Sequence, residues 1–97
     1  MKILGFDYTL SLMEARMADS RHYGECNNNE LTIRLARGLP VQQKEGSVLH
    51  EILEAIGYCL SLNLGEQTIL ALERGLHGAL ADAGVDLAPL LRGLEEP

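Results

Sequence analysis

The sequence has no tryptophan and few aromatic residues of any kind. One Phe and three Tyr occur among 97 residues, so the hydrophobic core must be built mainly from Leu, Ile, Val and Ala. Hydrophobic residues make up 46% of the chain and charged residues 23%, which is typical of a globular rather than a disordered protein. A chain of this length forms one domain with a thin core. We therefore expect a single domain over residues 1–97.

The sequence also lacks basic clusters, long apolar runs and paired cysteines. Its net charge is -6, whereas proteins that bind nucleic-acid phosphates need clustered Lys and Arg. The first residues, MKILGFDYTLSL, contain too short an apolar run for a signal peptide or a membrane span. Cys26 and Cys59 form no C-x-x-C pattern, which favours two free thiols in a reducing compartment. We expect a cytoplasmic protein that binds neither nucleic acid nor membranes.

The first 40 residues favour β-strands. Apolar and polar residues alternate in two segments, as in half-buried strands, with apolar positions at Tyr8, Leu10 and Leu12 and at Leu31, Ile33 and Leu35. RHYGEC, residues 21–26, is a weaker candidate, and the three asparagines after it favour a turn, so the second and third strands are predicted to form a hairpin. Gly38-Leu39-Pro40 ends this region. The expected sheet has three antiparallel strands within residues 2–36.

From Val41 onward the apolar residues recur with the period of a helix. Two helices are predicted, at about 41–61 and 66–82, with one apolar face each: Leu49, Leu53, Ile56 and Leu60 on the first, and Ile69, Leu72, Leu76 and Leu80 on the second. Gly65 marks the break and Gly84 suits the end of the second helix. In the tail, 85–97, four leucines fit a short helix that should pack on the domain or on a partner. The predicted fold class is α+β, with the sheet followed by two packed helices.

The stretch VLHEILEAI carries the residues with the clearest chemical potential. It differs by one residue from H-E-x-x-H, in which two histidines one turn apart hold zinc and the glutamate handles protons. Here Glu54 stands where the second histidine would be. On a helical wheel Glu54 lies about 40° from His50, and Glu51 lies about 100° from it. His50 and Glu54 are thus stacked neighbours, although such a pair alone is more often a solvated helix edge than a metal site.

The second helix has further metal-binding side chains along one border of its apolar face: Glu66, Glu73 and His77. In an antiparallel hairpin that turns at residues 62–65, Glu73 and His77 lie at the height of the His50 pair. Glu66 lies level with Leu60 instead. The geometry favours Glu73 as the third ligand, and Glu66 or His77 remains an alternative or an additional ligand.

With these residues in place, the sequence resembles the small zincin-like metallopeptidases of gluzincin type from bacteria and phages. The resemblance covers nearly the whole chain: a G-x-x-x-x-x-x-L-x-I-x-L hairpin from Gly24 to Leu35, then VLHEILEAI, then LERGLHGALADAG. It implies a small antiparallel sheet packed on two helices. It also implies a divalent metal ion, with zinc as the first expectation and manganese or iron as alternatives.

The resemblance also implies a role for each site residue. His50 matches the first metal ligand, Glu51 the general base, Glu54 the second-ligand position and Glu73 the downstream glutamate ligand. Glu54 departs from the family's histidine, and a more anionic ligand set makes the ion a weaker Lewis acid and lets manganese or iron compete better. The expected function is hydrolysis of a peptide or protein substrate, weak or latent, with the strand at residues 31–35 aligning the peptide.

Two other functions fit the same residues. The chain could be a non-catalytic interaction or scaffold protein that retains the peptidase fold, and its Leu-rich second helix and apolar tail would suit a homodimer. It could also hold a carboxylate-rich iron- or oxygen-binding site, but bundle proteins of that kind need carboxylates from more helices. Metal content separates the first and third functions from the second, and peptide cleavage separates the first from the third.

Overall fold

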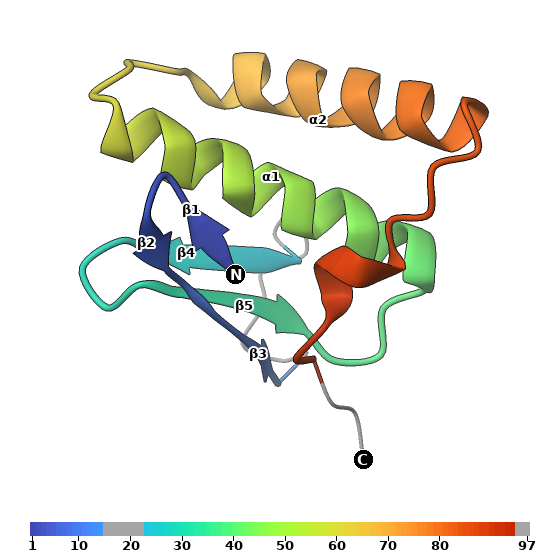
Figure 1. The fold of residues 1–97 in the computed structure, drawn as a ribbon, viewed down its shortest axis with the longest axis horizontal. Helices are drawn as coiled ribbons and strands as arrows, with labels where there is room; N and C mark the ends of the chain where they lie inside the picture. Colours follow the sequence, from blue (N-terminus) through green and yellow to red (C-terminus); the bar gives the residue numbers. More distant parts are fainter. Residues whose placement is uncertain (15–22, 95–97) are drawn as a thin grey trace.

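The elements of the chain form three layers. A computed structural model describes residues 1–14 and 23–94. In it a small sheet, α1 (Val41–Cys59) and α2 (Glu66–Asp82) lie one above the other, with α1 in the middle (Figure 1). The fold is therefore α+β with two helices, as the sequence predicts.

The helix boundaries follow the local signals in the sequence. Pro40 is the N-cap of α1 with φ -56°, and Gly65 is the extended N-cap of α2 with ψ 160°. Gly84, just after α2, has a φ of 77°, the left-handed conformation that glycine adopts at little cost. α1 ends at Cys59, two residues before its predicted end, and α2 has the predicted bounds.

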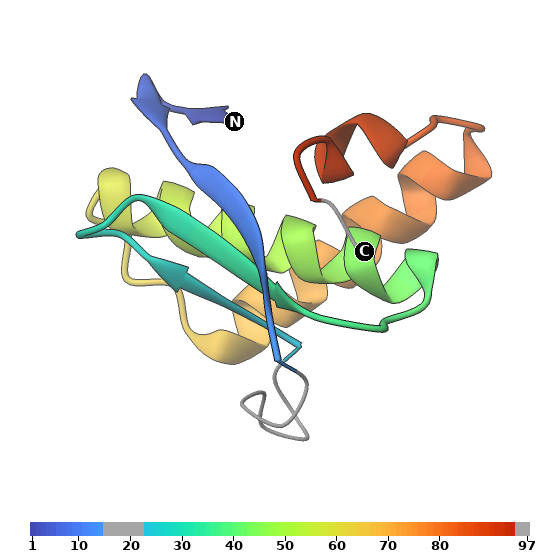
Figure 2. The ribbon, with the colours of Figure 1, turned by 90° about the horizontal axis from the view of Figure 1, so that it is seen from below.

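The main sheet has the strand order β3 (Thr9–Met13), β5 (Thr32–Ala36) and β4 (Gly24–Asn27). β4 pairs antiparallel with β5, so the predicted hairpin is confirmed. β3 pairs parallel with β5, so the prediction of a purely antiparallel sheet is wrong. Alternation of apolar residues reports which side chains face the core, and it says nothing about the partner or direction of a strand. Figure 2 shows the three strands in front of α1.

A second small sheet precedes the main one. β1 (Lys2–Ile3) and β2 (Phe6–Asp7) form a hairpin. The two turn residues between them, Leu4 and Gly5, both have positive φ, at 50° and 87°, as in the tight turns that connect hairpins. The strand predicted around Tyr8, Leu10 and Leu12 thus begins only at Thr9, after the buried Tyr8, and the two residues before Tyr8 belong to β2.

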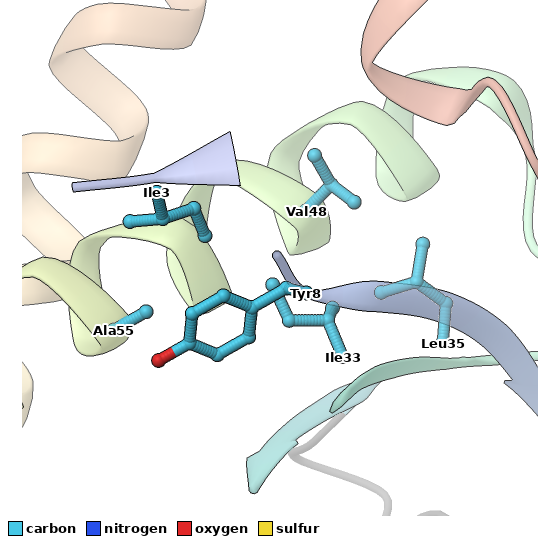
Figure 3. Close-up of a cluster of buried hydrophobic side chains, with 6 residues drawn as sticks. All are labelled: Ile3, Tyr8, Ile33, Leu35, Val48 and Ala55. Carbon is cyan, nitrogen blue, oxygen red and sulfur yellow. The ribbon is translucent and has the colours of Figure 1, made fainter. Parts of the chain in front are cut away.

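The hydrophobic core lies between the main sheet and α1 (Figure 3). Its buried side chains come from the N-terminal region, β5 and α1: Ile3, Tyr8, Ile33, Leu35, Val48 and Ala55. The fully buried positions of α1 are therefore not the predicted leucines, and Leu60 is 54% exposed. A helical wheel assumes one buried face, whereas α1 is covered on two sides.

α2 and the tail are packed in different ways. α2 packs chiefly on α1, and of its predicted apolar face only Ile69 is buried, while Leu72 and Leu76 are 42% and 43% exposed. The tail contains the 3-10 helix η2 (Ala88–Leu91). Leu87 is buried, and the three leucines after it pack against the core: Leu90, Leu91 and Leu94. The prediction that the tail packs on the domain is confirmed.

Because Leu87 is 8% exposed and Val85 is 47% exposed, the two residues offer a matched test of the tail. Leu87→Ala should lower the free energy of unfolding by about 2 kcal/mol, the usual cost of truncating a buried leucine. Val85→Ala should change it by less than about 0.5 kcal/mol. Urea denaturation followed by circular dichroism measures both, and equal effects of the two substitutions would contradict the packing of the tail.

Candidate metal centre

Three carboxylates surround the imidazole of His50 at the interface between α1 and α2. The Nε2 atom lies 2.9 Å from Oε1 of Glu66 and 3.3 Å from Oε1 of Glu54. The Nδ1 atom lies 3.0 Å from Oε1 of Glu73. The structure thus brings His50 and Glu54 together as predicted, places Glu66 beside them, and places Glu73 on the opposite side of the ring.

The Nε2 side of this cluster is a set of atoms that could hold a metal ion. One donor atom each from His50, Glu54 and Glu66 lies within 4.8 Å of the other two. Ligands bound tetrahedrally at 2.0–2.1 Å from zinc are about 3.4 Å apart, close to the two contacts of Nε2. Two carboxylates so close together repel each other, and a divalent cation between them would replace this repulsion with attraction.

Glu73 is the one predicted ligand that lies outside this set. An imidazole ring directs its two nitrogens in different directions, so a carboxylate at Nδ1 is far from an ion held at Nε2. Glu66, which the sequence left open as an alternative, occupies the place beside Glu54. His77, the other alternative, contacts Glu45 instead, with 3.2 Å between Nε2 and Oε1.

The loop between the helices explains why Glu66 reaches Glu54. A symmetric hairpin would put Glu66 nearer the turn, level with Leu60. In the structure the chain turns back over Gly57, where a Cβ would lie 3.2 Å from Cδ1 of Leu64. An extended residue advances about 3.3 Å and a helical one about 1.5 Å. The non-helical segment 62–65 therefore carries the start of α2 further back along α1 than helical spacing implies.

Glu51 lies beside this cluster and is only 4% exposed. Its carboxylate is against the first residue of β4, since a Cβ on Gly24 would lie 3.2 Å from Oε2 of Glu51. Burial first, and then the charge and hydrogen bond of Glu54 and the charge of Glu66, together raise the pKa of Glu51 to about 9. A cation in the cluster would lower this pKa, so Glu51 is a carboxyl group that can gain or lose a proton next to a bound ion.

Two pockets flank the cluster. The larger, of about 620 Å³, lies between α1, α2 and the start of β4, and His50, Glu51 and Glu66 are part of its wall. The smaller, of about 210 Å³, shares Glu66 and is also lined by Glu54. The described residues of the tail line neither pocket, so the leucines of the tail do not cover this site.

A second polar cluster joins the end of α1 to the sheet. The Tyr8 hydroxyl and the Cys26 thiol both donate to Oδ1 of Asn28, and the hydroxyl also lies 3.8 Å from Sγ of Cys59. Both cysteines are free thiols. Burial is the main cause that raises the pKa values of Tyr8 and Cys26 to about 12, so at neutral pH these groups stay protonated and support the fold.

Comparisons with models of protein families, with curated proteins and with solved structures find no match. Among the helices of the described residues, none is long and apolar enough to cross a membrane. A functional assignment therefore rests on the chemistry of the residues around His50.

The pKa of Glu51 predicts how the metal-free protein responds to pH. The folded chain holds this proton more tightly than the unfolded chain, whose carboxyl has a pKa near 4.5. The stability that the protonated group contributes is therefore complete below about pH 4.5 and is lost as the pH rises towards 9.

Glu51→Gln removes this titration while keeping the shape of the side chain and its ability to donate a hydrogen bond. In chelator-treated protein the variant should have the higher melting temperature at pH 9, by at least about 4 °C, the shift that roughly 1 kcal/mol produces in a domain of this size. The difference should shrink towards pH 5. The exposed Glu30→Gln serves as the control, and a pH profile of Glu51→Gln that parallels wild type would contradict the raised pKa.

Proposed function

We propose that this protein is a metal-dependent peptidase of the small zincin type. In this proposal His50, Glu54 and Glu66 hold one divalent ion, and Glu51 handles the proton of the hydrolytic reaction. The observation that carries the proposal is the position of a buried, proton-holding carboxyl group beside converging ligands at the wall of a pocket of about 620 Å³.

The chemistry of the ligands supports a hard or borderline divalent ion. One imidazole and two carboxylates are accepted ligands of zinc, and the two carboxylates also let manganese or iron compete. We propose zinc as the resident ion and manganese as the strongest competitor. The ion would supply Lewis acidity for polarising the carbonyl group of a peptide bond.

The residues of the chain supply the proton transfers. Glu51 accepts the proton of the attacking water and delivers it to the leaving amine, so that one carboxyl group serves as base and then as acid. Its position suits both steps, because its carboxylate lies near Glu54 and at the wall of the larger pocket.

The strand that aligns the substrate is β4 rather than β5. β5 is the central strand and pairs on both sides, so it has no free edge for a peptide, and the prediction that residues 31–35 align the substrate is wrong. β4 is an edge strand, and its first residue, Gly24, lines the larger pocket beside Glu51. An extended peptide that adds to this edge would pass the proton-handling carboxyl group.

A non-catalytic interaction protein on the same fold is the second candidate. Leu72 and Leu76 on α2 are 42% and 43% exposed, and exposed apolar side chains on one helix face suit a partner or a second copy of the chain. The two candidates differ in metal content and in peptide cleavage.

Two isosteric substitutions separate ligand from base. Glu66→Gln should lower the affinity for zinc by at least about 100-fold, because it leaves two ligands, too few for a stable site. Glu51→Gln should bind zinc like wild type and lose peptide cleavage, because no group remains to accept the proton. Calorimetric titration with zinc and manganese measures binding, and mass spectrometry of a peptide library measures cleavage.

The exposed Glu30→Gln is the control for both assays. A wild-type protein that binds neither ion at micromolar concentration would contradict the metal site. Cleavage by Glu51→Gln at the wild-type rate would contradict the role of Glu51.

Gly24→Ala tests the contact between β4 and the proton-handling residue. The added Cβ would meet Cδ2 of Leu35 at 3.0 Å, and Oε2 of Glu51 and the carbonyl oxygen of Arg34 at 3.2 Å. It should therefore displace the carboxylate and slow cleavage at least about tenfold, while zinc affinity changes little. Gly75→Ala, whose Cβ meets nothing within 4 Å, is the control. If Gly24→Ala cleaves as fast as the control, β4 does not position Glu51.

A further inference from the structure

We infer that Glu73 is a positioning residue for His50 rather than a metal ligand, and that Gly46 is the residue that admits Glu73 to the surface of α1. The inference rests on the proposed metal site. It concerns two residues, one on each helix, that do not touch the ion.

The contact between Glu73 and His50 gives the hydrogen on Nδ1 an acceptor on the side of the ring opposite the proposed ion. Oε1 of Glu73 lies 3.0 Å from Nδ1, and the two side chains are only 18% and 13% exposed. An ionised carboxylate only accepts hydrogen bonds, so the Nδ1 atom must donate. In the metal-free protein Glu54 and Glu66 offer the same kind of acceptor to Nε2, at 3.3 and 2.9 Å. When an ion takes the lone pair of Nε2, the one N–H group of the neutral ring lies at Nδ1 and donates to Glu73. Histidines that bind metals commonly donate their other N–H to a carboxylate, which fixes the ring in this way.

Gly46 leaves the space that this carboxylate needs. It is a buried residue of α1, one turn before His50. A Cβ at this position would lie 3.1 Å from Oε2 of Glu73, closer than side chains normally approach. A glycine within a helix costs conformational entropy, and at Gly46 the absence of a side chain permits the contact that orients His50.

His77 borders the same space from α2. Its Nδ1 atom would lie 3.5 Å from a Cβ at Gly46, while its Nε2 atom contacts Glu45, a residue of α1 that is 16% exposed. The carboxylate of Glu73 thus lies over Gly46 between two histidines that both contact glutamates across the helix interface. These neighbours limit the positions that the side chain of Glu73 can adopt.

The glycines of α2 give a matched control for Gly46. Gly75 lies within a helix like Gly46, but a Cβ there would meet nothing within 4 Å. Alanine favours helix at both positions, so a defect found only in Gly46→Ala cannot come from a weaker helix. The test compares Gly46→Ala, Glu73→Gln, Glu73→Ala and Gly75→Ala in the full chain.

The first readout is the tautomer of His50 in metal-free protein, measured by long-range ¹⁵N–¹H correlation at a pH where the ring is neutral. Wild type, Gly75→Ala and Glu73→Gln, whose amide oxygen can still accept, should show the same share of the Nδ1–H form. Gly46→Ala and Glu73→Ala should shift the population from that share towards Nε2–H, because they remove or displace the acceptor at Nδ1. No response of the tautomer to Glu73→Ala would overturn the inference whether or not the protein binds metal.

The second readout is zinc affinity. Gly46→Ala and Glu73→Ala should bind about 10–100-fold more weakly than wild type, the usual effect of removing a partner of a metal-binding histidine, and should still bind one ion per chain when saturated. Gly75→Ala should match wild type. Complete loss of the ion in Glu73→Ala would make Glu73 a ligand and overturn the inference. Absence of zinc binding in wild type would instead contradict the proposed function.

Discussion

The contacts of His50 with the glutamates of α2 are the interaction on which the rest of the site depends. α2 buries only Ile69, so the helix lacks the apolar face that usually attaches a surface helix to its domain. The contacts from His50 to Glu66 and Glu73 lie where such a face would be. Because α2 forms one wall of the larger pocket, these polar contacts help to hold the two walls of the cleft together.

The same contacts also destabilise the metal-free protein, because they bring several negative charges close together. Carboxylates gather around one imidazole that can carry a single positive charge, and the raised pKa of Glu51 is one consequence of this crowding and of burial. A divalent ion at Nε2 would offset the excess negative charge where it is greatest. The acidic interface, the buried Glu51 and the helical glycine at position 46 are together the features that the proposed cation site requires.

Much of the fold, and part of the site, follows from local patterns in the sequence. The helices and the β4–β5 hairpin were predictable because helical period, turn residues and capping glycines act over a few residues. The parallel pairing of β3 and the burial of α1 on two sides were not predictable. The alternation of apolar residues and the helical wheel do not tell which elements pack against one another. His50, Glu51 and Glu54 share one helix, so their spacing was readable. The position of Glu66 along α1 was predicted wrongly, because it depends on how far the extended segment 62–65 carries the chain back along α1.

The most direct test of the account is the position of a bound ion in crystals soaked with manganese. The anomalous signal locates the ion without assumptions about its ligands. The account predicts one peak within about 2.0–2.3 Å of Nε2 of His50 and of one oxygen each from Glu54 and Glu66, with Glu73 still at Nδ1. A peak between Nδ1 and Glu73, or no peak near His50, would contradict it.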